Sequence, residues 1–494
     1  MGGAEAHEEG TVGPAVSTQA EPTRRGRQLV LAVCCTSVFL SSLNNTVLNV
    51  ALPAMQRDLR SPLSGLQWTT DAYLIVLAAL LMLAGSAGDR LGRRRVFRTG
   101  LALFTLGSLL CAFAPGLGWL IAFRTVQAVG ASMLNPVAMS IITNTFTAPR
   151  ERARAIGVWG AVMGVAMAVG PLVGGVLVQG LGWRSIFWLN LPVGAAAFVC
   201  AARFVPESRA PRPRRVDPVG QALVVVLLGC LTYAIIEGPG TGWTAPRTLA
   251  CALAAPAALL ALVLHERRRT EPLVDLRVFR GAGFSGASAM AVLSFFVLGG
   301  FLFLNTLYLQ NVRGLSALAA GLCLLPMAVM NIVTSPLSGR LTATRGPRLP
   351  LLLAGAATAA GGVLLATGGA LTTDALLFTA YVLIGVGAGL ANTPVTDAAM
   401  SGMPREQAGV AAAVVATSRQ FGQALGVAVL GAVLTAGLHR SGTPFTRAVL
   451  PGYWIVTACG LAIVVLALAT TRRVVPAASP AGRRRRQAAG ARLG

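Results

Sequence analysis

Ionisable side chains are rare inside the apolar segments of this sequence, and those that occur there are candidates for proton exchange. Asp71 lies within the second apolar segment, roughly one or two helical turns from its end. Burial in apolar surroundings favours the protonated form of a carboxyl group, so Asp71 is the first candidate for a proton carrier. Asp397 is the second candidate, although it lies near the end of its segment, where water can reach it. A structural aspartate that only accepts hydrogen bonds is the alternative for Asp71.

Two arginines also fall inside apolar segments. Arg124 shares one helical face with Gln127 and Asn135. Arg419 lies near the middle of its own segment. An arginine at the centre of a membrane helix costs about 2.5–3.5 kcal/mol on insertion scales, so each should face an aqueous cavity or a polar partner. Snorkelling to the nearby membrane surface is the alternative for Arg124. The other candidates for lining a cavity are Asn44, Asn45, Trp68, Asn190, Asn305, Asn392, Gln420 and Gln423.

Membrane-spanning helices must position these residues. The chain has 494 residues, of which 54% are hydrophobic and 12% charged, and its mean hydropathy is +0.68. A typical soluble domain carries about twice this charged fraction. Apolar stretches of roughly twenty residues, each able to cross a hydrocarbon core of about 30 Å, predict an all-α membrane protein with about fourteen spans. We expect helices at about 29–51, 66–88, 96–114, 118–142, 155–179, 184–204, 218–237, 247–264, 283–309, 316–338, 349–369, 375–399, 408–437 and 452–471.

The arginines predict the orientation of these helices. All 41 basic residues are arginine, and the net charge is +24. With both termini in the cytoplasm, most arginines fall in inner loops and tails, as positive-inside topology requires. The basic runs therefore act as topology signals next to membrane lipid, and we expect no nucleic-acid partner. The outer loops then hold only Arg57, Arg60, Arg184, Arg247, Arg313, Arg440 and Arg447.

Two halves of the chain resemble each other. The segment 130–136, followed by Pro149-Arg150-Glu151, reappears as 387–394, followed by Pro404-Arg405-Glu406. Chance similarity among helices rich in glycine and alanine is the alternative to a repeat. Parallel repeats of this kind suit a transporter whose halves rock about a central site. The expected divisions are a cytoplasmic tail at 1–28, a six-helix bundle at 29–204, a linker with two inserted helices at 205–282, a second six-helix bundle at 283–471 and a basic tail at 472–494.

Several functional classes are disfavoured by what the sequence lacks. Without lysine it cannot supply a P-loop for ATP, although a separate ATPase subunit remains compatible with it. The eight cysteines fall in apolar segments without metal-ligand spacing, and the three histidines lie in tails or loops. No nucleophile with a neighbouring base is visible. We therefore expect neither an enzyme, a cofactor nor a metal site.

The loop between the second and third helices carries opposite charges between glycines. Its residues are Gly85, Gly88, Asp89, Arg90, Gly92 and Arg93. Glycines permit a tight turn and close helix contact, and the aspartate can pair with an arginine. These features suggest a gate on the cytoplasmic side. The alternative is a cytoplasmic loop whose positive charges only set the membrane topology.

The fifth helix carries a stripe of small residues. Gly157, Gly160, Gly164, Ala168, Pro171 and Gly175 fall at helical spacing on one face. Such stripes let helices pack closely and slide, and Pro171 permits bending. Ordinary helix packing is the alternative.

Together these motifs resemble the major facilitator superfamily. The glycine-rich loop resembles its loop signature, and the set Arg124, Gln127 and Gly130 resembles its fourth-helix motif. Trp183 to Gly194 resembles the sixth-helix start of its fourteen-helix drug:proton antiporters. Its antiporter motif in the fifth helix is matched by Gly164, Gly170, Pro171, Gly174 and Gly175.

The resemblance implies the major facilitator fold, with two six-helix bundles and two inserted helices in a bacterial inner membrane. It also implies efflux of a lipophilic or cationic organic compound, such as an antibiotic, driven by the proton motive force. Many relatives have an aspartate where Asn44 stands, and an asparagine cannot exchange a proton. Asp71 would then have to carry the proton. An uptake permease or facilitator for a metabolite, and a membrane sensor that transports nothing, are the alternative functions.

Overall fold

The structure is a computed structural model that describes residues 24–210, 217–269, 276–368, 373–400, 408–439 and 443–471. The tail 472–494, most of the tail 1–28 and the second Pro-Arg-Glu, at 404–406, lie outside the described residues. Fourteen helical segments in this part of the chain are long and apolar enough to cross a membrane. The predicted all-helical fold with fourteen spans is confirmed.

The first six spans are followed by the two inserted helices, α8 and α9. The first six are α1 (Arg24–Asp58), α2 (Leu63–Leu91), α3 (Arg93–Ala112), α4 (Leu117–Thr145), α5 (Pro149–Leu181) and the pair α6 (Ser185–Trp188) and α7 (Asn190–Phe204). The inserted helices are α8 (Pro218–Thr241) and α9 (Pro246–Arg268), followed by a short 3₁₀ turn, η1 (Val278–Arg280).

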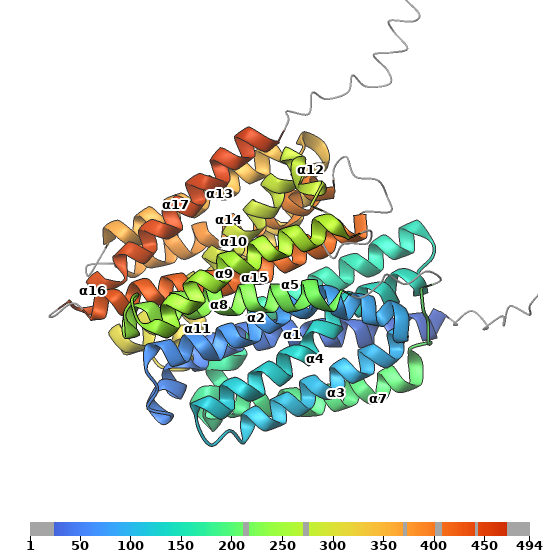
Figure 1. The fold of residues 1–494 in the computed structure, drawn as a ribbon, viewed down its shortest axis with the longest axis horizontal. Coiled ribbons are helices and arrows are strands. Elements are labelled where there is room, and N and C mark those ends of the chain that lie inside the picture. The colour runs from blue at the N-terminus through green and yellow to red at the C-terminus, as the bar shows by residue number, and fades with distance from the viewer. Residues whose placement is uncertain are drawn as a thin grey trace, which may run out of the picture.

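The remaining six spans form the second bundle. They are α10 (Ala282–Leu307) with the π-helical segment η2 (Tyr308–Val312), α11 (Ala317–Cys323) with α12 (Leu325–Arg345), α13 (Arg348–Gly368), α14 (Asp374–Met400), α15 (Ala408–Leu438), and α16 (Phe445–Ala448) with α17 (Leu450–Thr470). In Figure 1 the blue and cyan helices of the first bundle lie below the orange and red helices of the second.

Three spans are interrupted, of which the sequence predicts two, 184–204 and 316–338, as continuous; the third break precedes the predicted helix 452–471. The breaks fall at Leu324 and Val449, each two residues before a proline, and at Leu189, three residues before Pro192. Proline lacks a backbone N–H and clashes with the carbonyl four residues earlier, so it starts a helix more readily than it continues one. The first helix also begins at Arg24, five residues earlier than the sequence suggests.

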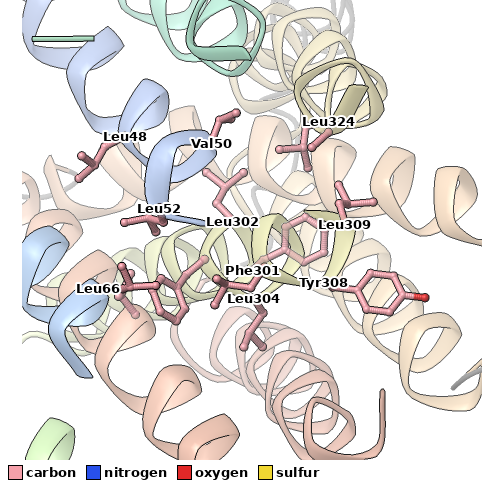
Figure 2. Packing of buried hydrophobic residues seen from close by; sticks show 14 of the residues in the cluster. Leu48, Val50, Leu52, Leu66, Phe301, Leu302, Leu304, Tyr308, Leu309 and Leu324 are labelled. Atoms are coloured by element: carbon pink, nitrogen blue, oxygen red, sulfur yellow. The ribbon is translucent and has the colours of Figure 1, made fainter. Parts of the chain in front are cut away.

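The two bundles meet at one end through apolar side chains. We call this end outer, because the predicted topology places both termini at the opposite side. Leu48, Val50 and Leu52 of α1 pack there with Phe301 and other residues of α10, as Figure 2 shows. The Gln310 side chain also donates to the Val50 carbonyl at 2.9 Å. These contacts close the outer side between the bundles.

On α5 glycines towards the outer end pack tightly, whereas three glycines nearer the inner end have open space around them in the described structure. Gly174 packs against Val47 of α1, and an added Cβ at Gly175 would lie 2.7 Å from the Leu318 Cα of α11. Gly157 and Gly164 belong to the same helical stripe but have no heavy atom within 4 Å of such a Cβ. The stripe therefore contacts the second bundle at its outer end, and its inner glycines are not packed against described atoms.

Candidate functional site

A buried polar network lies in the core of the first bundle. Gln127 Nε2 donates to Ser108 Oγ at 2.7 Å and to Asn44 Oδ1 at 3.2 Å. Asn190 Nδ2 reaches the same two acceptors, at 3.3 Å and 3.5 Å. The four residues come from α1, α3, α4 and α7, and all are buried. The network therefore ties four helices together.

Arg124 extends this network. Its Nη1 donates to Gln127 Oε1 at 2.6 Å, and its Nε donates to the Thr69 carbonyl at 3.1 Å. The guanidinium also lies over the Tyr73 ring, 4.2 Å from the ring centre. The side chain is 1% exposed, so it does not snorkel to the membrane surface. Its position is set by an amide, a carbonyl and an aromatic face.

Asp71 is completely buried in α2. Neither carboxylate oxygen has a hydrogen-bond partner in the described part of the chain. An ionised carboxylate without donors is costly in apolar surroundings, so this site suits the protonated form. Gln67, one helical turn earlier on α2, donates to the Ala428 carbonyl of α15 at 2.9 Å. Residues four apart share a helix face, which places Asp71 on the side of α2 that packs against α15.

The other candidates lie in different surroundings. Asp397 is exposed near the end of α14. Asn135 is half-buried and accepts a hydrogen bond from Ser41 Oγ at 3.3 Å. Asn45 is also half-buried, and its carbonyl accepts from Asn49 Nδ2 at 3.0 Å. The structure therefore keeps Asp397 apart from the buried network.

The second bundle holds a similar network that centres on Asn305. The Tyr381 hydroxyl donates to Asn305 Oδ1 at 3.0 Å, and the Tyr453 hydroxyl is 3.3 Å from the same oxygen. All three side chains are buried. Asn44 likewise receives bonds from the fourth and sixth spans of its own bundle, so in each bundle an asparagine of the first span accepts from the same two spans. Sequence reasoning identified Asn305 but missed both tyrosines.

Arg419 obtains its partners from α14. Its Nη2 donates to the Asn392 carbonyl at 3.0 Å and to Thr396 Oγ1 at 2.7 Å. Its guanidinium is 5.5 Å from the centre of the Phe295 ring. Next to it, Gln420 Oε1 has no partner among the described residues, and Gln423 is buried against Gly299.

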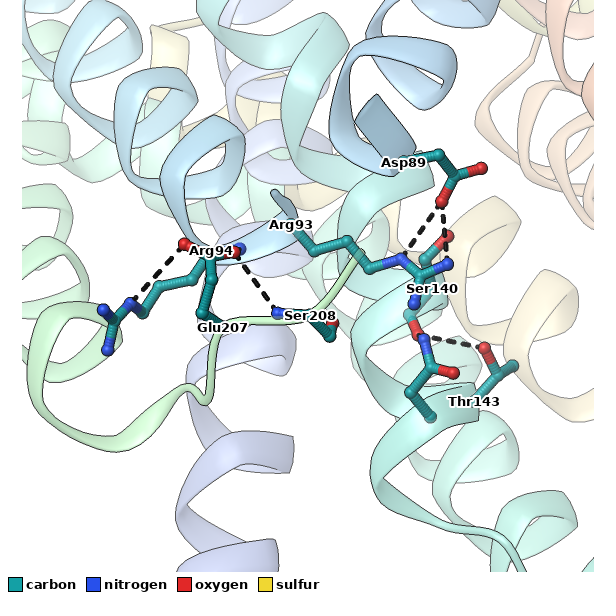
Figure 3. A network of polar contacts seen from close by, with 8 residues as sticks. Asp89, Arg93, Arg94, Ser140, Thr143, Glu207 and Ser208 are labelled. Carbon is teal, nitrogen blue, oxygen red and sulfur yellow. Dashed lines mark hydrogen bonds and ion pairs between the residues drawn. The ribbon is translucent and has the colours of Figure 1, made fainter. Parts of the chain in front are cut away.

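The glycine-rich loop brings its charged residues together. Asp89 Oδ1 accepts from Arg93 Nη2 at 2.7 Å, as Figure 3 shows. Gly92 has φ 111°, a conformation that side-chain-bearing residues rarely adopt. Gly88 lies close to Val137 of α4, whereas Arg90 is exposed.

The linker after α7 is hydrogen-bonded to this loop, a contact that the sequence did not suggest. The Arg93 N–H donates to the Ser208 carbonyl at 2.9 Å, and the Ala210 N–H donates to the Asp89 carbonyl at 3.1 Å. Glu207 Oε1 accepts from the Arg94 N–H at 3.2 Å and from the Ser208 N–H at 3.3 Å, and Figure 3 shows the bond to Ser208. The bonds of the motif therefore join the first bundle to its own linker.

The inserted helix α8 is fixed to α2 by side-chain hydrogen bonds. Trp68 Nε1 donates to Glu237 Oε1 at 2.8 Å near the outer end, and Gln221 Nε2 donates to the Ala79 carbonyl further inward. At the inner end, Asp217 accepts from the Gly220 N–H and from Arg269. Burial alone would raise the pKa of the Asp217 carboxyl, but these bonds and the nearby positive charges hold it below its ordinary value.

Residues 34–427 match the family model of the Major Facilitator Superfamily. The chain belongs to this superfamily. The multidrug resistance protein Stp of Mycobacterium tuberculosis is 37% identical over 427 residues, which cover 86% of this chain and 79% of that protein. The tetracenomycin C resistance and export protein of Streptomyces glaucescens is 36% identical, over 83% of this chain and 77% of that protein. The family resemblance that the sequence motifs indicated is confirmed, and the superfamily is one of transporters and not of enzymes.

Solved structures of the superfamily share the fold. A bacterial homologue of the human lysosomal transporter Spinster, in an inward-facing and unoccupied conformation, superimposes with a TM-score of 0.61 at 18% identity, covering 90% of this chain and 96% of that one. A peptide transporter, POT, in complex with sulfate gives a TM-score of 0.64 at 15% identity, covering 89% of this chain and 93% of that one. These likenesses concern the fold alone.

Proposed function

We propose that this superfamily member is a proton-coupled exporter of a lipophilic or cationic organic compound across a bacterial inner membrane. The observation that carries the proposal is Asp71, which is fully buried with both carboxylate oxygens unpartnered in the described structure. The relatives of this chain include multidrug resistance and antibiotic export proteins. Such compounds are apolar enough to enter the membrane, where an exporter meets them.

Exchange of a proton for a substrate follows if both compete for the Asp71 carboxyl. In the closed surroundings of α2, Asp71 is suited to hold a proton. When water or a cationic substrate reaches it, the ionised form becomes the favoured one, and the proton leaves. Proton and substrate then bind different protonation states of the same carboxyl. Each therefore lowers the affinity for the other, which is sufficient for antiport.

The arrangement of the bundles supports alternating access. At the outer end of α5, Gly175 packs against α11 of the second bundle, whereas an added Cβ at Gly157 or Gly164 would meet no described atom within 4 Å. If the bundles came together at the inner end of α5 and parted at the outer end, the region around Asp71 would become accessible from the outer side. We propose that Asp89 and Arg93 serve this step, because their ion pair and the linker hold the inner ends of α2 and α3 in one shape.

The experiment is efflux from proteoliposomes under an imposed pH gradient. Asp71→Asn should abolish pH-driven efflux while insertion and folding stay normal. Asp397→Asn is the matched control, because that carboxylate is exposed, and it should retain efflux. Undiminished efflux by Asp71→Asn would refute the role of this residue. Uptake into right-side-out vesicles, without proton-driven accumulation in everted ones, would instead identify a permease.

A further inference from the structure

One carboxylate near the outer side differs from the others in its partners. Asp58 accepts from Arg184 at 2.7 Å, and Asp374 accepts from Arg313 at 2.6 Å. Asp58 also accepts from the Trp183 indole at 2.8 Å. Glu237, four residues before the end of α8, likewise accepts from an indole N–H, that of Trp68 at 2.8 Å, but it has no arginine beside it in the described structure. Its negative charge is therefore not offset by an arginine in the described structure, although the chain as a whole is strongly basic.

Two aromatic rings stand beside this carboxylate. Tyr233 lies one helical turn before Glu237 on α8, so both side chains are on the same helix face. The Tyr233 ring is 6.0 Å from the Trp68 ring, and the two planes are tilted by 49°. The hydrogen bond to Glu237 also fixes the orientation of the indole. All three side chains are half-buried, so they are partly shielded and still accessible.

We propose that Trp68, Tyr233 and Glu237 form a binding site for an organic cation on the inserted helix α8. Aromatic faces attract cations, and an uncompensated carboxylate adds a direct charge interaction. The site supplies one carboxylate and two rings, whereas a metal ion such as calcium takes about six to eight oxygen ligands. A bulky, weakly hydrated cation such as a quaternary ammonium or phosphonium fits this chemistry.

The site gives the inserted pair a role beyond covering the bundles. Trp68 is three residues from Asp71 on α2, so a cation at this site would lie close to the group that we propose for proton exchange. The identity of the natural ligand rests on the proposed export function. The binding of a probe cation does not, because it requires no pH gradient.

The test is binding of tetraphenylphosphonium to the full-length protein in lipid nanodiscs, with triphenylphosphine oxide as a neutral probe of similar shape. Glu237→Gln keeps an oxygen that can accept from Trp68 but removes the charge. It should weaken cation binding by about tenfold, or remove one site from the measured stoichiometry, and leave the neutral probe unaffected. Asp374→Asn, which changes a carboxylate paired with arginine, is the control and should bind as the wild type does.

A second pair of variants keeps the proposal testable if Glu237→Gln does not fold. Tyr233→Leu should weaken cation binding, whereas Tyr233→Phe keeps the ring and should not. Wild-type affinity in both Glu237→Gln and Tyr233→Leu would show that the cluster is only an interfacial anchor, and would overturn the site. If the wild-type protein shows no pH-driven efflux but its cation binding still depends on Glu237, the proposed export is refuted and the binding site is supported.

Discussion

The substitution Asn44→Asp would place a carboxyl group within the buried polar network of the first bundle. In the structure, Asn44 Oδ1 accepts from Gln127 and Asn190, while Asn44 Nδ2 has no partner among the described residues. Aspartate has the same shape and replaces that unpartnered donor by an oxygen. The carboxyl keeps the oxygen that accepts both existing bonds, and its second oxygen can accept from the neighbouring Tyr73 hydroxyl, which has no other partner in the described structure. We expect the variant to fold and insert normally.

The bond lengths allow the electrostatic terms to be compared. Asn44 is connected to Arg124 through Gln127 by hydrogen bonds of 3.2 Å and 2.6 Å. With the width of one amide group, the two charges would lie within about 8 Å, which gives about 2 kcal/mol of attraction at an effective dielectric constant of about 20. Each charge-assisted hydrogen bond adds about 1.5–3 kcal/mol. Desolvation opposes them by several kcal/mol. The terms nearly balance, so the new carboxyl can both hold and release a proton.

The assay uses this balance in a background that cannot exchange protons. Asp71→Asn is expected to lack pH-driven efflux, and adding Asn44→Asp should restore at least about a tenth of the wild-type rate. Asn49→Asp is the matched control, because Asn49 is also buried on α1 but bonds only within its own helix. It should restore nothing. Efflux is measured in proteoliposomes at equal protein density and equal imposed pH gradient.

Two results would refute the reasoning. If the double variant inserts normally but shows no pH-driven efflux, a carboxyl beside Arg124 is not sufficient for exchange. If Asn49→Asp rescues as well as Asn44→Asp, the network has no special role, and any acid on α1 serves.

Three further predictions concern a helix contact, a buried hydrogen bond and a buried charge. An added Cβ at Gly175 would lie 2.7 Å from a backbone atom of α11, so Gly175→Val should push the two helices apart. Cysteines at the outer end should then become easier to label, and efflux should fall by about tenfold. Gly164→Val, in open space, should fold normally and is its control. Tyr381→Phe removes one hydrogen bond to buried Asn305 and should lower the free energy of unfolding by about 1 kcal/mol in thermal melts. Asp217→Asn should lower the melting temperature at pH 7. The lowered pKa means that this contribution persists in mild acid and vanishes only well below about pH 4, where the melts of both proteins should converge.

Much of the fold follows from apolar length alone, since a helix that crosses a bilayer must satisfy its own backbone and stay apolar over its whole length. The helical period likewise places Arg124 and Gln127 on one face, where the structure joins them. The prolines that interrupt three spans are visible in the sequence. Whether a proline bends or breaks a helix, however, depends on the neighbouring helices that restore the lost hydrogen bonds.

The partners that come from distant spans could not be predicted. Tyr381 and Tyr453 resemble ordinary aromatic core residues until the fold brings them to Asn305. One partner of Arg419 is a backbone carbonyl, which every residue carries. The stripe on α5 is evident from spacing, but which of its glycines touch the second bundle depends on the conformation of the transporter.

The hydrogen bonds of α8 divide the molecule into moving parts. Trp68 and Ala79 of α2 both bond to α8, whereas α8 also packs against α15 of the other bundle. When the bundles rock, α8 should therefore travel with the first bundle as one rigid body, and the surface of α15 should slide beneath it. A disulfide engineered between α8 and α2 would then leave turnover intact, while one between α8 and α15 would halt the cycle.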